Sequence, residues 1–288
     1  EIKSAPYSMK NSNLGRKTLS NNLLGTHNVL CAIKESQLDI HLVHIGSMGV
    51  YGYGHLSQIV PEGYIEIEAE DSTQKVEVLH PVFPNSIYHL SKCLDQDLFQ
   101  FYGSVEKLRI TDLHQGIVWG SQTADTAKSP LLVNRLDNDF WYGTVLNRFI
   151  TQSALGEKLT VYGTGEQTRA FIKLNDVIKC LELVLMSSHV HQHRVRILNQ
   201  ATETHRVVDL AKRIQRLTSA EIEFIANPRK EAVRNNLSVT NKTILEMGLL
   251  PNKISDAALT DEISFVKFIN GTNAINVWKN PRDARMEQ

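Results

Sequence analysis

Apolar residues recur at helical spacing in several parts of the chain, and short β-rich runs separate these stretches. The first stretch predicts a helix over residues 18–34, with Leu19, Leu23, Leu30 and Ile33 on one face. The run HLVHIG that follows predicts a strand at residues 42–45, ended by a glycine. The chain therefore begins as a helix followed by a strand.

Alternation of apolar and polar residues predicts a β-hairpin insertion over residues 64–80, with its turn at residues 71–73. A helix over residues 86–102 follows, because four apolar side chains share one stripe: Leu90, Leu94, Leu98 and Phe101. The next strand runs through Leu108 and Ile110 to turns at Gly116 and Gly120. Alternating helices and strands of this kind predict an α/β fold with a mainly parallel sheet.

The pattern loosens after Lys128, where we place the boundary of a second, smaller lobe covering residues 129–288. Within it the spacing predicts helices at 143–155, 175–186, 207–217 and 257–268, and a short strand at 159–162. We expect part of residues 166–200 to return to the sheet of the first lobe, which covers residues 1–128.

Composition narrows the class of protein. The 288 residues hold 31 Lys and Arg against 31 Asp and Glu, so no net field favours nucleic acid or an anionic membrane. Three cysteines stand far apart without a C-x-x-C pair, which argues against a disulfide scaffold or a structural zinc site and favours a reducing compartment. No apolar run approaches the ~18 residues of a membrane span, so we expect a soluble protein. His189, His191 and His193 lie in a polar stretch that favours a solvated loop over a metal site.

Candidate chemistry gathers around Tyr88 and Lys92, which are four residues apart on one face of the predicted helix. An ammonium beside a phenol favours the phenolate, so such a tyrosine can take a proton near neutral pH. Ser47 follows the predicted strand at 42–45, and hydroxyls at the carboxyl end of such a strand face the ligand crevice of an open α/β sheet. Each feature alone also fits chance or a turn, but the combination favours a catalytic site.

These residues belong to longer motifs, G-S-x-x-V-Y-G, Y-x-x-x-K and V-Y-G-x-G-x-x-T-R. Together they resemble the extended short-chain dehydrogenase/reductases, the NAD-dependent epimerase/dehydratase group that modifies nucleotide sugars on a Rossmann-like sheet. S-A-P-Y-S-M, Y-H-L-S-K, N-R-L-D-N-D, L-N-R-F and N-P-R-K-E are similar, more narrowly, to the UDP-sulfoquinovose synthase family. That resemblance runs from residue 4 to about residue 250.

The resemblance implies that UDP-glucose and sulfite are the substrates and NAD the cofactor, and that UDP-sulfoquinovose, the sulfolipid head-group donor, is the product. In that family the residue that matches Tyr88 is the base at the C4 hydroxyl. The residue that matches Lys92 tunes the pKa of this tyrosine and anchors the cofactor ribose, and the residue that matches Ser47 is an active-site hydroxyl. His89 matches a second acid/base candidate. Asn21, Gln115 and Val118 match positions that hold the cofactor, and Gln115 also matches one that holds the sugar.

The resemblance also implies a substrate side built on a diphosphate. Arg169 and Arg229 match phosphate contacts, for which a planar guanidinium is suited. Further substrate-binding positions match Lys3, Asn147, Thr160, Tyr162 and Gln167. Val50 stands where the family has Glu, and Lys3 where it has Arg, so one acid near the hexose and one guanidinium fork are absent.

The family begins with a strand and a Gly-rich turn that cradles the NAD pyrophosphate, and no G-x-x-G-x-x-G occurs in this sequence. We therefore expect a fragment or truncated product that binds NAD weakly, leaves an apolar edge at residues 42–45 and self-associates. The resemblance also implies a homodimer through helices 18–35 and 86–102, in a bacterial cytoplasm or plastid stroma. Two alternatives stay open: a UDP-sugar 4-epimerase and a catalytically inactive UDP-sugar-binding protein.

Overall fold

The computed structural model describes residues 1–53, 57–68, 74–129, 132, 141–187, 194–229 and 231–271. The predicted hairpin turn at 71–73, the N-R-L-D-N-D motif at 134–139 and His189, His191 and His193 lie outside the described residues.

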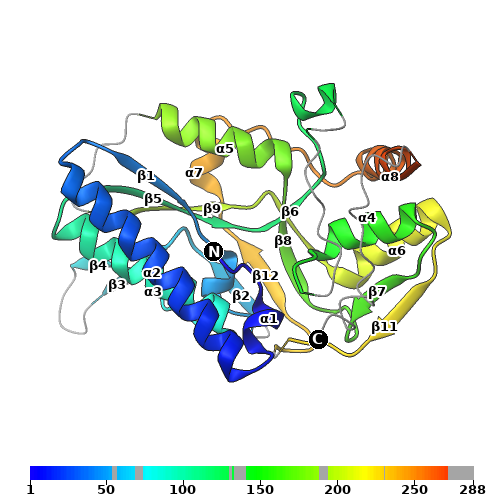
Figure 1. Ribbon diagram of the computed structural model, residues 1–288, viewed down its shortest axis with the longest axis horizontal. Helices are drawn as coiled ribbons and strands as arrows, with labels where there is room; N and C mark the ends of the chain where they lie inside the picture. Colours follow the sequence, from blue (N-terminus) through cyan, green and yellow to red (C-terminus); the bar gives the residue numbers. More distant parts are fainter. Residues whose placement is uncertain are drawn as a thin grey trace.

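A parallel sheet of three strands organises the first part of the chain. Its order is β1 (His41–Ile45), β5 (Arg109–Gln115) and β9 (Arg196–Gln200), with Ile45 opposite Leu113 and Leu113 opposite Leu198. The long helices α2 (Ser12–Ser36) and α3 (Ile87–Ser104) cover one face, and α5 (Leu174–Met186) covers the other (Figure 1). The predicted α/β class with a Rossmann-like parallel sheet is confirmed.

Strand alternation explains these two layers. Ile110 and Ile197 point to one face and pack with Leu30 of α2 and Phe99 of α3. Residues of the opposite parity, among them Leu113 and Leu198, pack instead against Val177, Cys180 and Val184 of α5. Leu30 of the predicted α2 stripe faces the sheet. The predicted stripe of α3 is not its buried face, because Leu90 and Leu94 are only partly buried and Phe101 is 50% exposed. Polar side chains, among them Lys92 and Asp95, occupy the buried face instead, where Lys92 bonds to β1.

A second lobe surrounds a core of its own. The antiparallel pair β8 (Thr168–Lys173) and β10 (Glu203–Arg206) extends to β6 (Ile117–Trp119), which runs parallel to β8. Beside it β7 (Leu159–Tyr162) pairs with β11 (Ile222–Ile225), and three helices pack there: α4 (Val145–Ala154), α6 (Val207–Thr218) and α8 (Asp256–Gly271). Trp119 precedes the boundary predicted near Lys128, yet its ring lies in this core.

Shorter elements fill the space between the lobes and at the edges. The hairpin is β3 (Tyr64–Glu68) with β4 (Lys75–Leu79), and its antiparallel pairing of Ile67 with Val76 confirms the prediction. The sequence pattern did not reveal the parallel pair β2 (Ser57–Val60) and β12 (Asn236–Val239), nor α1 (Ala5–Met9), η1 (Met48–Tyr51), η2 (Thr126–Lys128) and α7 (Lys242–Glu246). Each is too short to show a period.

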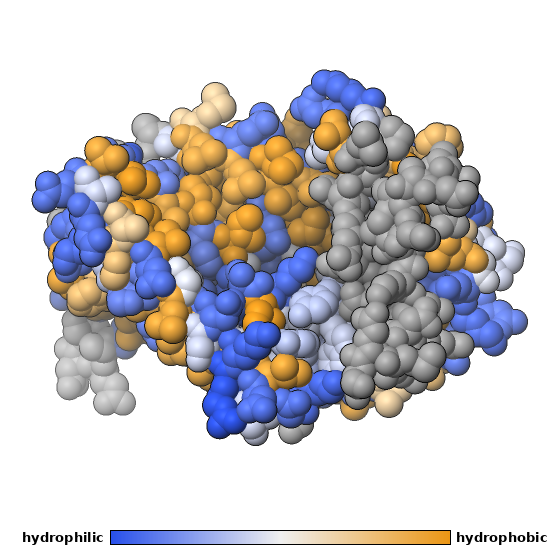
Figure 2. All heavy atoms as spheres, viewed as in Figure 1, coloured by the Kyte–Doolittle hydropathy of each residue, from blue (hydrophilic) through white to orange (hydrophobic). Residues whose placement is uncertain are grey.

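Among the described residues, no strand pairs with the second edge of β1. A depression of about 280 Å³ lies along it, lined by Val29 of α2, His44 and Ile45 of β1, and Phe99 of α3. Figure 2 shows hydrophobic side chains gathered on the viewed face over the sheet and α5. None of the helices in the described part of the chain has the length and apolar character that a membrane crossing requires.

Candidate active site

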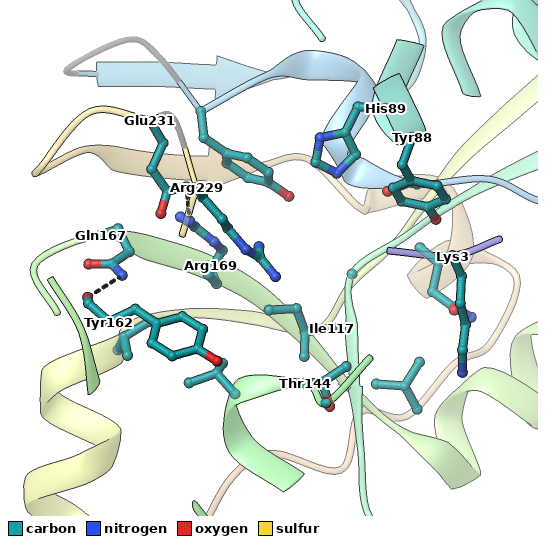
Figure 3. Close-up of a pocket in the computed structure, with 18 of the residues that line it drawn as sticks. Lys3, Tyr88, His89, Ile117, Thr144, Tyr162, Gln167, Arg169, Arg229 and Glu231 are labelled. Atoms are coloured by element: carbon teal, nitrogen blue, oxygen red, sulfur yellow. Dashed lines mark hydrogen bonds and ion pairs between the residues drawn. The ribbon is translucent and has the colours of Figure 1, made fainter. Parts of the chain in front are cut away.

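A cavity of about 290 Å³ opens where the carboxyl ends of β1 and β5 meet the second lobe. Figure 3 shows Tyr88, His89 and Lys3 toward one end and Arg169, Arg229 and Glu231 toward the other. The lining residues are Lys3, Gly46, Ser47, Tyr53, Tyr88, His89, Gln115, Gly116, Ile117, Val118, Gly143, Thr144, Val145, Arg148, Tyr162, Gln167, Arg169, Val207, Arg229 and Glu231.

Ser47 and Tyr88 meet in this cavity. Ser47 follows β1, and its Oγ accepts a hydrogen bond from the backbone N–H of Gly49 at 3.1 Å. The Ser86 side chain caps α3, so Tyr88 lies in the first helical turn, and its phenol lines the cavity together with Ser47. Burial raises the pKa of Tyr88, the carboxylate of Glu1 adds to this, and the nearby Ser47 hydroxyl opposes it. This direction is opposite to the lowering expected from Lys92.

Lys92 lies one turn further along α3, behind the cavity wall. Its side chain is 2 % exposed, and Nζ donates to the carbonyl oxygen of Ile45 at 3.2 Å and to Glu1 Oε2 at 2.9 Å. The third neighbour of Nζ is His44 Nε2, at 3.1 Å. The ammonium is thus fixed below the end of β1, and Glu1 neutralises part of its charge.

His89 is buried and neutral. Burial, aided by the charges of Arg229 and Arg169, lowers the pKa of His89 to about 3. Asn85 Oδ1 lies 2.7 Å from Nδ1, which assigns the ring proton to Nδ1 and leaves Nε2 with a lone pair. A Cβ atom at Gly49 would lie 2.2 Å from His89 Cδ2, so only glycine allows this packing.

The opposite end of the cavity is rich in guanidinium groups. Arg169 pairs with Glu231, and its Cζ lies 4.3 Å from the ring centre of Tyr53. Asn227 Nδ2 donates to the other carboxylate oxygen of Glu231 at 3.0 Å. The Nε atom of Arg229 is buried without a hydrogen-bond partner among the described residues, and burial and the charge of Arg169 lower the pKa of Arg229. One carboxylate against two guanidinium groups leaves this end positive and suited to an anion.

Arg148 adds a third guanidinium group to the lining. It is fully buried, donates from Nη2 to the carbonyl oxygen of Thr160 at 3.0 Å, and has Cζ 4.2 Å from the ring centre of Tyr162. Gln167 Nε2 donates to the carbonyl oxygen of Tyr162 at 3.1 Å (Figure 3). These contacts hold the Tyr162 ring against the cavity.

The structure brings most of the predicted site residues to this cavity, including Lys3, Gln115, Val118, Tyr162 and Gln167. It does not bring four others to the lining, and the first of these, Lys92, lies behind the cavity wall. The Asn147 side chain accepts a hydrogen bond from the N–H of Gly120 at 3.0 Å and donates one to the carbonyl oxygen of Val118 at 3.3 Å. Thr160 exchanges two hydrogen bonds with the Gln152 side chain. Asn21 lies beside the β1 depression instead.

Val50 is also absent from the cavity. Its side chain is 1 % exposed and packs in an apolar cluster with Met48, Tyr51 and Cys93. The carboxylate that does line the cavity, Glu231, follows Arg229 by two residues in the N-P-R-K-E motif. Sequence reasoning took only the arginine from that motif, and it also missed Tyr53 and Arg148. The sequence signal that could have revealed Glu231 was its opposite charge, two residues after Arg229.

The model of the NAD dependent epimerase/dehydratase family matches residues 5–199. The chain belongs to this family. The motifs around Ser47, Tyr88 and Arg169 therefore predicted the epimerase/dehydratase family correctly from sequence.

Within the epimerase/dehydratase family, two curated relatives are similar over most of the chain. The chloroplastic UDP-sulfoquinovose synthase of Spinacia oleracea is 38% identical over 270 residues, which is 92% of this chain and 55% of that protein. The UDP-sulfoquinovose synthase of Sulfolobus acidocaldarius is 34% identical over 258 residues, 88% of this chain and 64% of that protein. The chain thus spans between about half and two thirds of the length of these relatives.

Solved structures of the epimerase/dehydratase type share the fold. UDP-glucuronic acid 4-epimerase from Bacillus cereus, in complex with UDP-glucuronic acid and NAD, superposes with a TM-score of 0.65 at 21% identity. That match covers 87% of this chain and 68% of the epimerase. A dTDP-glucose 4,6-dehydratase from Streptomyces venezuelae gives a TM-score of 0.66 at 16% identity, over 88% and 68% of the two chains.

The described residues fit one half of an NAD molecule. Ile117 and Val118 give an apolar wall beside the Ser47–Tyr88 pair, as a flat nicotinamide ring requires, and the Lys92 ammonium lies behind it. The printed sequence offers no Gly-rich G-x-x-G-x-x-G cradle for the pyrophosphate. Ser47, Tyr88, Gln115 and Val118 line this part of the cavity, and Lys92 lies behind its wall.

Proposed function

We propose that this chain carries the reaction centre of a UDP-sulfoquinovose synthase, which converts UDP-glucose and sulfite to UDP-sulfoquinovose and water with NAD. One observation carries the proposal: the Ser47–Tyr88 pair and the guanidinium groups of Arg169 and Arg229 face each other across a single cavity. A UDP-sugar has its reacting hexose at one end of a diphosphate, which matches this separation. The identity to two UDP-sulfoquinovose synthases supports the choice of substrate.

In the proposed mechanism, Tyr88 removes the proton of the glucose C4 hydroxyl. A bound NAD would supply the acceptor for the hydride from C4 and the source of the hydride when C4 is reduced again. The resulting 4-ketone acidifies C5, water leaves from C5 and C6, and sulfite adds at C6. The Ser47 hydroxyl can donate to the Tyr88 phenolate, because a hydroxyl donates one hydrogen bond while it accepts another from Gly49. Lys92 is proposed to stabilise this phenolate against the burial and the Glu1 carboxylate that raise the pKa of Tyr88 in the free chain.

His89 is the proposed base for the C5 proton. It is neutral, so the imidazole can accept a proton, and its Nδ1–H is anchored on Asn85. Protonation would place a third positive charge near Arg169 and Arg229, so the proton is then readily lost again. Val50 has no carboxylate, and its side chain packs away from the cavity, so it takes no part in this step.

Arg169 and Arg229 are the proposed ligands of the diphosphate. Arg169 is already oriented by Glu231 and Tyr53, so little side-chain freedom is lost on binding. Among the described residues the buried Nε of Arg229 has no hydrogen-bond partner, and a phosphate oxygen would satisfy it. Gln115, Gln167 and Lys3 line the remainder of the path and are proposed to contact the hexose and the nucleotide.

We also propose a homodimer through α2 and α3 and a reducing compartment, either plastid stroma or bacterial cytoplasm. The homodimer is supported by exposed apolar side chains on the two helices, Leu24 and Phe101. The cysteines, Cys31, Cys93 and Cys180, form no disulfide, as a reducing compartment requires.

The test is to incubate the chain with NAD and UDP-glucose, with and without sulfite, and to identify products by mass spectrometry. UDP-sulfoquinovose that requires sulfite and disappears in Tyr88→Phe supports the proposal. UDP-galactose formed without sulfite would show a 4-epimerase instead. UDP binding by calorimetry without either product would show an inactive UDP-sugar-binding protein.

A further inference from the structure

A buried row of hydrogen-bonded side chains continues from Lys92 into the sheet. Lys92 Nζ lies 3.1 Å from Nε2 of His44, on β1, and His44 Nδ1 lies 2.8 Å from Asp112 Oδ1, on β5. The His44 ring also packs on Phe99, with 4.7 Å between ring centres. His44 is thus the only described side chain that joins Lys92 to this row.

The contacts determine which atoms carry protons. An ammonium and an imidazolium cannot both donate across 3.1 Å, and lysine is the stronger base by about four pKa units. Lys92 therefore donates to a lone pair on His44 Nε2, and the ring proton of His44 lies on Nδ1, which donates to Asp112. In this tautomer His44 is neutral and orients the ammonium.

The rest of the row fixes Asp112. Its second oxygen lies 3.0 Å from His114 Nε2, and His114 Nδ1 lies 2.8 Å from the hydroxyl of Tyr51. Burial opposes ionisation of Asp112, but His114 and His44 outweigh it and hold the pKa of Asp112 far below its usual range. A Cβ at Gly46 would lie 2.4 Å from Asp112 Oδ1, so the chain leaves room for this carboxylate.

The charges around His44 come from three parts of the chain. From α3 it faces Lys92 and, at 3.7 Å, Asp95, and from β5 it faces Asp112. Glu1 of the amino-terminal segment reaches the same ammonium. The nearby Thr26 side chain of α2 opposes the rise in the pKa of Asp95. Burial raises the pKa of Asp95, so this carboxylate loses its charge more readily than an exposed one as the pH falls. In the described part of the chain, Lys92 is the one cation in contact with the His44 ring.

We propose that His44 is a positioning residue for Lys92, and that it holds the ammonium beside the Tyr88 helix turn only while its ring is neutral. Protonation of Nε2 places two cations 3.1 Å apart and drives Lys92 out of position. The site would then lose activity on the acid side through His44, a residue that touches neither the cavity nor the proposed substrate.

The first test reads the tautomer of the chain itself and needs no substrate. In two-bond ¹H–¹⁵N spectra of ¹⁵N-histidine-labelled protein at neutral pH, His44 should show a protonated Nδ1 and a bare Nε2. The signal is assigned by its loss in His44→Gln, and His41→Gln serves as the control because His41, on the same strand, bonds Thr111 instead. A ring protonated at Nε2 overturns the proposal.

The second test follows the ammonium. Lys92 is the buried lysine of the described residues, so its NH₃⁺ group should exchange slowly and give a resolved ¹⁵N signal. His44→Leu should shift or broaden this signal, whereas His44→Gln, which keeps an acceptor at the same reach, should preserve it. A signal that is identical in His44→Leu and wild type overturns the proposal, provided that the thermal melts of the variants agree within a few degrees.

The third test is kinetic, and it alone rests on the proposed function. His44→Leu should lower kcat about tenfold, which corresponds to about one pKa unit in an essential group, with KM for UDP-glucose little changed. His44→Gln should keep kcat and lack the acid limb of the pH profile. An acid limb that is unchanged in His44→Gln overturns the pH dependence. Absence of any turnover refutes the proposed function and leaves the two spectroscopic results to decide the role of His44.

Discussion

The guanidinium group of Arg169 lies over the ring of Tyr53, with Cζ 4.3 Å from the ring centre. Glu231 holds the same guanidinium group from another side, and the ring is itself buried. Arg169 is therefore held in place before any ligand arrives.

This relationship predicts a role for the Tyr53 ring in nucleotide affinity. Tyr53→Leu should raise the Kd for UDP about tenfold, or about 1.4 kcal/mol, because a desolvated cation–π contact is worth that much. Tyr53→Phe keeps the ring and should bind like wild type. The matched control is Tyr64→Leu, which removes a ring 3.8 Å from Arg194 outside the cavity. Calorimetry with UDP decides, and equal losses in both leucine variants would contradict the prediction.

Arg229 should contribute through its charge and its fork of donors. Arg229→Gln should weaken UDP binding about tenfold to a hundredfold, which is the range for lost charge-assisted hydrogen bonds. The affinity of Arg229→Lys for UDP should lie between those of wild type and Arg229→Gln. The surface pair of Arg194 and Glu77 supplies the control, since Arg194→Gln removes a similar charge elsewhere. The salt dependence of Kd should flatten in Arg229→Gln alone. A Kd within twofold of wild type would remove Arg229 from the site.

The low pKa of His89 predicts how stability depends on pH. Its folded pKa of about 3 lies below the usual unfolded value of about 6.5, so the unfolded chain binds the proton more readily. Stability is then fully present above pH about 6.5 and falls, as the pH drops towards 3, by up to about 1.4 kcal/mol per pH unit. Urea unfolding should show the difference between wild type and His89→Gln changing in this window and constant above it. A constant difference throughout would show that His89 is not held neutral.

Gly49 and His89 should depend on each other. Gly49→Ala should destabilise the fold by about 1–3 kcal/mol and displace the imidazole, because the new Cβ would overlap the ring. His89→Ala removes the obstacle, so the double variant Gly49→Ala, His89→Ala should be no less stable than His89→Ala alone. Thermal unfolding of the four proteins completes the cycle. Additive losses would mean that the cost of Gly49→Ala does not come from the His89 ring.

Association of the chain tests the apolar edge of β1. Val29 lines the depression beside this edge and is 49% exposed, whereas Phe101 of α3 is 50% exposed. We expect concentration-dependent association in sedimentation velocity, as for an unpaired strand edge. Val29→Lys should reduce association through the β1 edge, and Phe101→Lys should reduce a dimer through the helical face. Monomers at all concentrations in wild type would contradict both.

Periodicity in the sequence was enough to predict the positions of the long elements and the hairpin. It did not predict the buried face of α3, which carries the polar side chains of Lys92 and Asp95. It did not predict β2, β12 and η1, whose few residues owe their conformation to neighbours distant in sequence. In the same way, motifs led to Ser47, Tyr88, His89, Arg169 and Arg229, all of which line the cavity. Asn147 and Thr160 sit within similar motifs, yet backbone groups and Gln152 use their hydrogen bonds, which no spacing reveals.

Asn22 gives the amino-terminal segment an unexpected influence. Its amide bonds both the N–H and the carbonyl of Ile2, at 2.8 and 3.1 Å, and also Ser91 on α3. The two neighbours of Ile2 carry opposite charges, and one, Glu1, reaches Lys92 while the other, Lys3, reaches the cavity. A single carboxamide thereby positions the charged side chains of Glu1 and Lys3 near Tyr88. Substitutions on helix α2 could therefore change the acidity of the phenol without altering a residue that contacts the sugar.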